Sequence, residues 1–231
     1  MSALSVTAVR IHADMKWDDY KYLASMVSKE RQERIFRMRF DVDRIYSMLG
    51  EIIARKCISE TRGIPFESIE FHKGSYGKPY VNLEKPLSFN WSHSGDWILF
   101  ALDSEQVGID VETVRPVNEM DLASHFFDPQ EVIQLEEMNS IERKRYFFKL
   151  WSLKESYIKW KGTGLSIKLN SFRFIYNEQK GLLFSNNYGD TCYFQMIHLD
   201  SEHFAAVCMS RKDGQKSYIK KFEVDKFLNS I

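Results

Sequence analysis

Two acidic residues, Asp110 and Glu112, lie one residue apart in the apolar segment VGIDVETV. Side chains alternate along a β-strand, so both carboxylates project from one face while Ile109 and Val111 occupy the other. Like charges this close repel each other unless a cation lies between them, and carboxylate oxygens are ligands that suit Mg²⁺. The segment therefore predicts a metal site or, as the plainer alternative for so short a motif, a solvated strand face.

A third carboxylate lies in a later segment with helical periodicity. Trp151, Glu155 and Ile158 fall at positions i, i+4 and i+7, so Glu155 shares a helix face with two large apolar residues and is expected to point inward. An ordinary intrahelical ion pair with Lys159 would satisfy it. The functional alternative is that Glu155 completes a three-carboxylate metal site and leaves Lys154 and Lys159 to face an anion.

The segment NWSHS places His93 between two serines. A Ser/His/Asp triad is poorly supported, because adjacent side chains project apart and the chain contains no GxSxG motif. Lys78 of YGKP, together with Arg31 and Arg34 on one predicted helix face, could join His93 in binding a phosphate. Taken singly, His93 is more often a hydrogen-bonded turn residue, and each of these cations is more often plain surface charge.

Hydrophobic periodicity predicts the elements that must position these residues. We expect a strand at 6–12, helix through 28–60, a hairpin in which 97–103 turns into 107–114, and a C-terminal region that is mostly sheet. The DPQE pattern at Asp128 predicts a capped helix start. A further helix is expected from about Ser140 to Gly162, where glycine ends it.

The composition excludes several classes of protein. With 231 residues, 44% of them hydrophobic, the chain can build a substantial core. Lys plus Arg equals Asp plus Glu at 32 each, so no global field attracts nucleic acid or a membrane, and we expect neither as a partner. Three scattered cysteines favour a reducing compartment, and the N-terminal segment lacks signal-peptide or transmembrane character, so we expect a cytoplasmic protein.

The ordered set of segments YGKP, NWSHS, VGIDVE and WSLKESYIKWKGTGL resembles that of the surfactin-type 4'-phosphopantetheinyl transferases. The resemblance covers nearly the whole chain, and the length of the chain is similar to that of the large monomeric type. It implies an α+β fold of two pseudo-symmetric α/β halves, residues 1–105 and 106–231. Each half would be a small, mostly antiparallel sheet packed with helices, with the active site between the halves and the metal site in the second. The repeated LDSE at Leu102 and at Leu199 modestly supports this duplication.

The resemblance also implies an activity, a co-substrate and a partner. Members of this family transfer phosphopantetheine from coenzyme A to a serine of an acyl- or peptidyl-carrier protein and release adenosine 3',5'-bisphosphate. By resemblance, Mg²⁺, or alternatively Mn²⁺, is held by Asp110, Glu112 and Glu155. The expected catalytic residues are Glu155, Lys159 and His93. Glu155 would be the base, directly or through water, Lys159 would neutralise charge on the phosphates or the leaving group, and His93 would contact phosphate. The expected coenzyme A contacts are Arg31, Arg34, Ser47, Lys78, Ser92, His93, Lys154 and Lys159.

One position departs from the family pattern. The family usually carries Arg before the hydroxyl residue, as in DAxRxLLGE, whereas this chain reads DRIYSMLGE with Tyr46 in the Arg place. Arg44 lies two residues earlier, about 200° around the helix, so it cannot substitute for the missing Arg. The departure bears on adenosine-phosphate binding rather than on the reaction.

The segment NEMDLASHFF, residues 118–127, is a candidate for carrier docking. On amphipathic grounds its Met120, Leu122, Phe126 and Phe127 are expected to enter the core, and the alternative is that some stay exposed to meet a carrier helix. Two rival functions use the same residues. They are a Mg²⁺-dependent nucleotide phosphohydrolase and a binding module without turnover.

Overall fold

A computed structural model describes residues 4–12, 14–177, 179, 181–211 and 218–231. Its strands are β1 Ser5–Arg10, β2 Phe71–Lys73, β3 Pro79–Val81, β4 Ser88–Ser94, β5 Trp97–Asp103, β6 Val107–Thr113, β7 Phe172–Asn177, β8 Gly181–Asn186, β9 Tyr193–Ile197, β10 His203–Met209 and β11 Tyr218–Glu223. Its α-helices are α1 Trp17–Tyr20, α2 Lys29–Arg37, α3 Asp41–Arg62, α4 Glu119–Phe126, α5 Pro129–Glu136, α6 Ser140–Lys161 and α7 Val224–Leu228. Short 3₁₀ segments occupy Lys21–Met26, Phe66–Ser68, Gly164–Ser166 and Leu169–Ser171.

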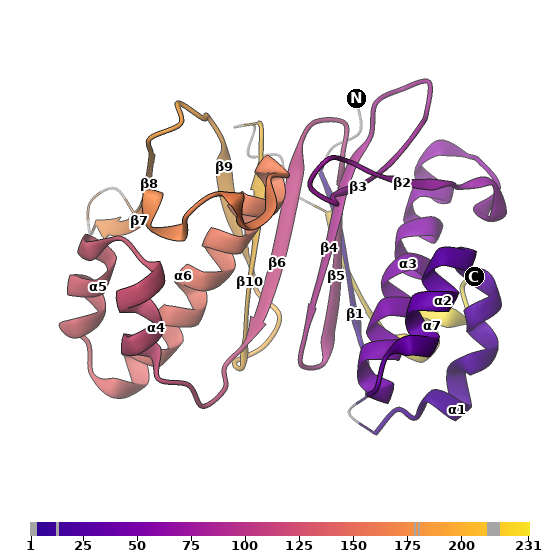
Figure 1. The fold of residues 1–231 in the computed structure, drawn as a ribbon, viewed down its shortest axis with the longest axis horizontal. Helices are drawn as coiled ribbons and strands as arrows, with labels where there is room; N and C mark the ends of the chain where they lie inside the picture. Colours follow the sequence, from indigo (N-terminus) through magenta and orange to yellow (C-terminus); the bar gives the residue numbers. More distant parts are fainter. Residues whose placement is uncertain (1–3, 13, 178, 180, 212–217) are drawn as a thin grey trace.

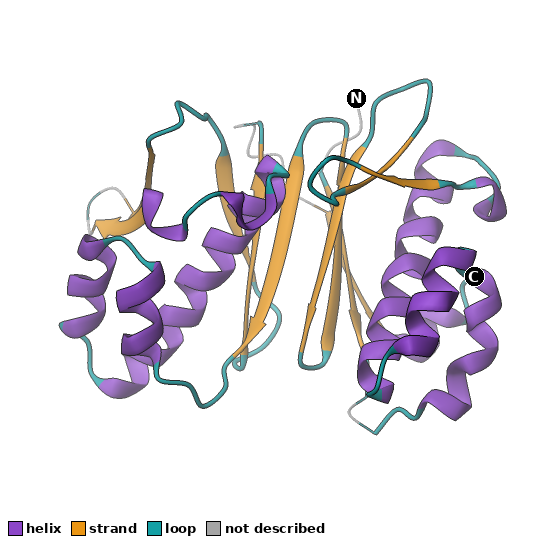
Figure 2. Cartoon of the chain, viewed as in Figure 1, coloured by secondary structure: helices purple, strands orange, loops and turns teal. Residues whose placement is uncertain are grey.

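The strands form two principal sheets, which lie between two groups of helices (Figure 1). The first has the order β11-β1-β5-β4, with β1 parallel to β11 and the other pairs antiparallel. The second has the antiparallel order β6-β10-β9. Two hairpins, β2–β3 and β7–β8, lie outside these sheets. The predicted α+β class, with small sheets packed against helices, is confirmed (Figure 2).

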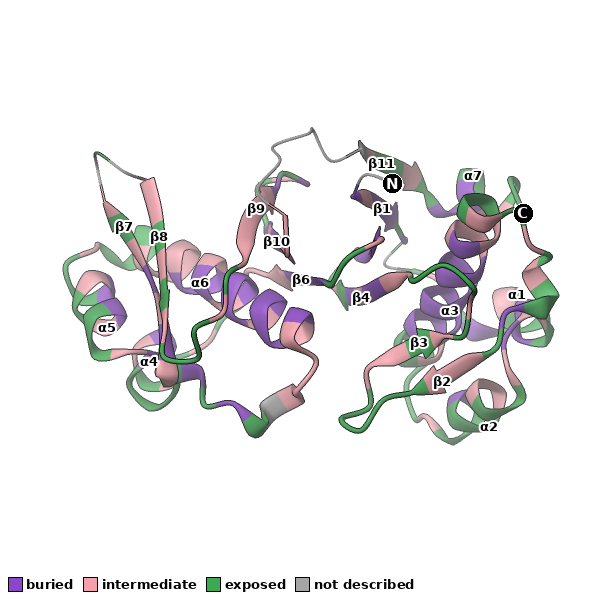
Figure 3. Ribbon diagram, turned by 90° about the horizontal axis from the view of Figure 1, so that it is seen from above, coloured by how far each residue is buried: buried purple, intermediate pink, exposed green. Residues whose placement is uncertain are grey.

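Three hydrophobic clusters hold these layers together. One lies between the first sheet and α3, and includes Ile45, Leu49 and Phe100. Another lies around α6 and β7, and includes Phe147 and Phe172. The remaining cluster joins the inner faces of the two sheets through Val6, Leu99, Ile109, Val207 and their neighbours. The view from above shows buried residues concentrated along α3, α6 and the inner strands (Figure 3).

Two topological expectations differ from the structure. Strands β5 and β6 do not form a hairpin, because the chain crosses at 104–106 from the first sheet to the second. The C-terminal region is also not confined to the second half. After β10 the chain returns, so that β11 pairs with β1 and Phe227 of α7 packs in the first core. The sheets thus divide the chain differently from the expected 1–105 and 106–231, since 218–228 joins the first half.

The predicted helix signals are confirmed, with one break. The capping box at Asp128 starts α5, and α6 ends at Lys161 where Gly162 adopts a left-handed φ of 71°. The expected helix at 28–60 is two helices, because Met38 and Phe40 are extended between α2 and α3. Ser28 caps α2 by accepting a hydrogen bond from the Arg31 backbone N–H.

Strands β4 and β6 meet through side chains, and we call this contact the β4–β6 seam. In the described chain no backbone–backbone hydrogen bond joins these two strands. Instead, β4 side-chain oxygens accept from β6 backbone N–H groups: Ser88 from Val107 at 3.1 Å, Asn90 from Ile109 at 3.0 Å and Ser94 from Thr113 at 3.0 Å. The fourth residue of this alternation, Ser92, donates to the Asp110 carboxylate at 2.8 Å. The seam therefore fixes Asp110 relative to the first half.

Gly108 allows α6 to lie directly on β6. A Cβ atom at this position would come within 2.1 Å of the Trp160 backbone N and 2.3 Å of the Ser156 backbone O. Both neighbours are backbone atoms of a long buried helix, so they cannot move aside cheaply. The absence of a side chain at Gly108 thus sets the distance between the helix and the strand that carries Asp110.

We expect Gly108→Ala to lower the free energy of unfolding by about 3 kcal/mol, because overpacking against backbone forces the helix outward. Urea denaturation of the purified variant measures this change. Gly74→Ala is the matched control, since its Cβ would meet only the Lys78 carbonyl at an ordinary 3.5 Å. Equal stability of the two variants would contradict the proposed close packing.

Candidate active site

A cavity of about 340 Å³ opens where β4, β6 and α6 meet. All three predicted metal-ligating carboxylates line it, together with the predicted lysine and the serine–histidine pair. The lining residues are Trp91, Ser92, His93, Asp110, Val111, Glu112, Trp151, Glu155 and Lys159. The structure therefore brings β6, β4 and α6 to one place, and we call this hollow the carboxylate cavity.

Asp110 lies at the base of the carboxylate cavity and is 3% exposed. Its Oδ1 accepts hydrogen bonds from Ser92 Oγ at 2.8 Å and from Lys159 Nζ at 2.5 Å. Its Oδ2 is buried and has no hydrogen-bond partner within the described residues. Burial raises the pKa of Asp110, and Lys159 and Ser92 oppose that rise. A buried carboxylate oxygen without a partner is costly, which suits a cation as its missing neighbour.

Glu112 and Glu155 complete an acidic cluster with Asp110. Burial, followed by the charge of Asp110, raises the pKa of Glu112 to about 7. Burial and Asp110 also raise the pKa of Glu155. Both carboxyls therefore hold their protons more tightly than exposed glutamates, because negative charges converge in a partly desolvated place. A bound cation would reverse this effect.

The donor set of the carboxylate cavity fits a hard divalent cation. Three carboxylates from β6 and α6 face one cavity, and one oxygen has no other partner. Within the described ranges, however, no three acidic, His or Cys side chains are already close enough to form a ready-made site. The Lys159 ammonium lies against Asp110, and no ion pair joins Lys159 to Glu155. The intrahelical pair considered above is therefore absent, and Lys159 takes the position of a counter-charge.

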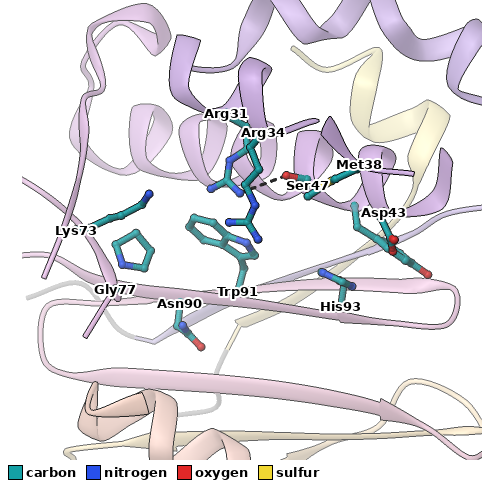
Figure 4. Close-up of a pocket in the computed structure, with 12 residues that line it drawn as sticks. Arg31, Arg34, Met38, Asp43, Ser47, Lys73, Gly77, Asn90, Trp91 and His93 are labelled. Atoms are coloured by element: carbon teal, nitrogen blue, oxygen red, sulfur yellow. Dashed lines mark hydrogen bonds between the residues drawn. The ribbon is translucent and has the colours of Figure 1, made fainter. Parts of the chain in front are cut away.

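A second cavity of about 470 Å³ lies beside the first, against α2 and α3 (Figure 4). Its lining residues are Arg31, Arg34, Met38, Asp43, Tyr46, Ser47, Lys73, Gly77, Pro79, Asn90, Trp91 and His93. We call it the arginine cavity, because the side chains of Arg31 and Arg34 reach into it from α2. Trp91 and His93 line both cavities, so the two hollows adjoin, and we call the pair the cleft, with a basic end and an acidic end.

The two arginines are held differently. Arg31 Nε lies 3.1 Å from the buried Glu51 carboxylate, and Arg31 Nη1 donates to Ser47 Oγ at 3.3 Å. Its guanidinium also lies over the Trp91 ring, 5.7 Å from the centroid. Arg34 is exposed and forms no ion pair or hydrogen bond with another described residue. Arg31 is thus pre-positioned, while Arg34 is available to an anion.

Two predicted contacts lie elsewhere. Lys154 is fully buried, where it pairs with Glu131 at 2.7 Å and donates to the Leu169 and Phe172 carbonyls. Because all its donors point into the second core, it cannot also face an anion, and that expectation is corrected. Lys78 donates to the Val107, Lys159 and Trp160 carbonyls. It lines neither cavity, burial lowers its pKa to about 8, and it fastens the YGKP loop to the end of α6.

Three contributors were missed by the sequence reasoning. Lys73 lines the arginine cavity and pairs with Glu30 across its edge. Trp91 forms the common wall, and Glu51 orients Arg31. Lys73 lies just before the YGKP segment, and Trp91 belongs to NWSHS, so alternation from His93 could have placed Trp91 on the same strand face. Nothing local indicates that the helix residue Glu51 pairs with Arg31. As expected, Arg44 binds Asp41 and the Met38 carbonyl instead of replacing the family arginine.

Comparisons with known proteins agree with this arrangement. The family model described as "4'-phosphopantetheinyl transferase superfamily" matches residues 106–208, and "4'-phosphopantetheinyl transferase, N-terminal" matches residues 15–105. A 4'-phosphopantetheinyl transferase from Bacillus subtilis is 33% identical over 192 residues, covering 83% of this chain and 85% of the relative. The chain belongs to the 4'-phosphopantetheinyl transferase superfamily.

Two further 4'-phosphopantetheinyl transferases show how far the likeness extends. The transferase from Bacillus pumilus is 34% identical over 90% of this chain and 89% of its own length. That from Aneurinibacillus migulanus is 37% identical over 73% of this chain and 70% of its own length. The suspected surfactin-type 4'-phosphopantetheinyl transferase family is thereby confirmed. No helix in the described part of the chain has the length and apolarity needed to cross a membrane.

The raised pKa of Glu112 predicts pH-dependent metal binding by this phosphopantetheinyl transferase. Because a protonated carboxyl is a poor ligand, Mg²⁺ affinity should increase as pH rises through about 7. Without metal, and at a pH between the ordinary glutamate pKa and about 7, folded Glu112 keeps a proton that the unfolded chain has lost. The free energy of unfolding should therefore decrease as the pH rises through this range. The rise in Tm on adding Mg²⁺ should therefore be larger at about pH 8 than at about pH 6.

Differential scanning fluorimetry with a fixed Mg²⁺ concentration measures this difference. Glu112→Gln should remove most of the pH dependence, whereas Glu136→Gln, an exposed glutamate of α5, should leave it intact. A Mg²⁺-induced Tm shift that is equal at both pH values in the unaltered chain would contradict the assignment of Glu112 as a ligand.

Proposed function

We propose that this chain transfers the 4'-phosphopantetheine group of coenzyme A to a serine of an acyl- or peptidyl-carrier protein and releases adenosine 3',5'-bisphosphate. One observation carries the proposal. A cavity lined by two arginines adjoins a cavity lined by three carboxylates, and Trp91 and His93 line both. A coenzyme A molecule carries a 3'-phosphate and a pyrophosphate, separated by a ribose, and such a cleft offers each group its own counter-charge.

In this proposal Asp110, Glu112 and Glu155 hold Mg²⁺, and Mn²⁺ suits the same oxygen ligands. The bound cation supplies charge neutralisation on the pyrophosphate. Support comes from the unpartnered Asp110 oxygen and from the raised pKa values of the three carboxyls. The seam hydrogen bond from Ser92 orients Asp110.

The proposed reaction is a displacement at phosphorus. The serine Oγ forms a bond to the phosphorus that carries pantetheine, and the bond from that phosphorus to adenosine 3',5'-bisphosphate breaks. Glu155 takes the serine proton, directly or through water, because its carboxylate lines the cavity in which the phosphates would lie. Lys159, whose Nζ contacts Asp110 and Ser92, neutralises charge that develops on the phosphate oxygens.

The arginine cavity is proposed to hold the nucleotide end of coenzyme A. Arg34 faces the cavity without a partner among the described side chains, and Arg31 and Ser47 lie beside it. Lys73 supplies an ammonium at the edge of this cavity, while Lys78 fastens the adjoining loop. Ser92 and His93 lie where the two cavities join and are proposed to contact phosphate. Because one chain lines the whole cleft, we propose a monomer.

Carrier docking is proposed at α4, next to the carboxylate cavity. Phe127 is 2% exposed and belongs to the second core, and Met120 and Leu122 are half-buried. Phe126 is 44% exposed, and its ring lies 6.0 Å from that of Trp151, which lines the carboxylate cavity. Phe127 therefore lies in the core, as one alternative expects, whereas Phe126 stays exposed, as the other expects. Phe126 is the side chain available to an apolar helix surface of a carrier.

The transfer reaction is tested by the intact mass of an apo carrier protein incubated with the chain, coenzyme A and Mg²⁺. We expect a gain of one phosphopantetheine that a chelator abolishes. Coenzyme A breakdown without a modified carrier would instead indicate the phosphohydrolase. Ligand binding without any turnover would indicate a binding module.

We expect Glu155→Gln to lower the transfer rate at least about 100-fold, because the variant loses both the base and a metal-binding charge. Its circular dichroism should match that of the unaltered chain. Glu142→Gln, an exposed change on the same helix, is the matched control and should transfer at the normal rate. Full activity of the Glu155 variant would remove this residue from both proposed roles.

We expect Phe126→Ala to raise the KM for carrier about tenfold and to leave the KM for coenzyme A unchanged, because only a docking contact is lost. Steady-state kinetics with each substrate varied in turn measures both constants. Ile133→Ala, which truncates a 53% exposed side chain on α5, is the control. An unchanged carrier KM in the Phe126 variant would place docking elsewhere.

A further inference from the structure

His93 lies at the junction of the two cavities without a polar partner. It sits near the end of β4, and its ring lines both hollows. No hydrogen bond or ion pair joins its imidazole to another described residue. A side chain that must present its ring nitrogens to a phosphate therefore has no polar contact to fix its rotamer.

Tyr46 supplies a different contact. Its ring is stacked on that of His93 with the centroids 4.3 Å apart and the planes 11° from parallel. Tyr46 is 9% exposed, and its hydroxyl donates to the Gly95 carbonyl in the turn that follows β4. One end of the tyrosine is thus fixed by helix α3 and the other by the turn. The imidazole therefore lies against a ring that is held at both ends.

The stacking geometry leaves the edge of the imidazole open. In a face-to-face pair one face of His93 is covered by Tyr46, while both ring nitrogens project from the edge and can meet a ligand. The charged groups around this pair are Lys159 from α6, Asp43 from α3 and Asp96 from the turn. Burial and Lys159 lower the pKa of His93, and burial raises that of Tyr46, which stays neutral.

We infer that Tyr46 is a positioning residue for His93, an inference that rests on the proposed transfer function. Tyr46 holds the imidazole by ring stacking so that the imidazole nitrogens face the phosphates of coenzyme A. This role explains the departure from the family pattern at this position. An arginine here would add a cation to the arginine cavity, whereas tyrosine provides a flat neutral support. Anion binding then depends on Arg34, Arg31 and Lys73.

The test is a double-mutant cycle between positions 46 and 93. Tyr46→Leu removes the ring, Tyr46→Met is a second non-aromatic variant that suits a helix, and Tyr46→Phe keeps the stack but loses the hydroxyl. Each is made in the unaltered chain and in His93→Ala. We expect the Leu and Met changes to lower kcat/KM for coenzyme A about tenfold in the unaltered chain and less than about twofold in His93→Ala. Tyr46→Phe should retain most activity.

Equal losses in both backgrounds would overturn the inference, because they would mean that Tyr46 acts on stability or binding without His93. A measurement that needs no turnover separates this result from failure of the proposed function. The His93 ring ¹H–¹³C resonance, assigned with His93→Ala, should lose its ring-current shift in Tyr46→Leu and Tyr46→Met but keep it in Tyr46→Phe. An unchanged resonance in the non-aromatic variants would also overturn it.

Discussion

The hydrogen bonds between β4 side chains and β6 backbone N–H groups are the constraint on which the site depends. A backbone ladder would have merged the two sheets into one, whereas here side-chain acceptors hold the strands together and the two sheets stay separate. The same alternation places Ser92 against Asp110. The β4–β6 seam therefore also provides a hydrogen bond to the acidic cluster. Gly108 adds α6, with Glu155 and Lys159, to this joint.

Charge is distributed so that each end of the cleft is incomplete. The basic end contains Arg34, which has no partner among the described residues. The acidic end contains carboxyls with raised pKa values and a buried oxygen that accepts no hydrogen bond from any described residue. At the acidic end, a protein that only had to fold would gain by pairing the buried oxygen, since unpartnered buried groups cost stability. The arrangement is accounted for when a phosphate and a divalent cation occupy the cleft together.

Much of this could be predicted from the sequence, because local patterns specify local structure. The capping box at Asp128, the glycine stop at Gly162 and the alternation around Asp110 each depend on neighbours within a few residues. What failed depended on distant partners. The sequence does not show that β11 pairs with β1, that β5 and β6 lie in different sheets, or that Glu131 forms an ion pair with Lys154 in the second core. Lysines in a motif look alike until the carbonyls or carboxylates that receive them are known.

The most direct test of the central claim is the anomalous scattering of Mn²⁺ in crystals of the chain grown with coenzyme A. The account predicts one Mn²⁺ peak within bonding distance of Asp110, Glu112 and Glu155, on the coenzyme A pyrophosphate, with the 3'-phosphate in the same molecule beside Arg34. A Mn²⁺ ion bound away from these carboxylates, or a coenzyme A molecule that occupies only one of the two cavities, would contradict the account of a single cleft with two complementary ends.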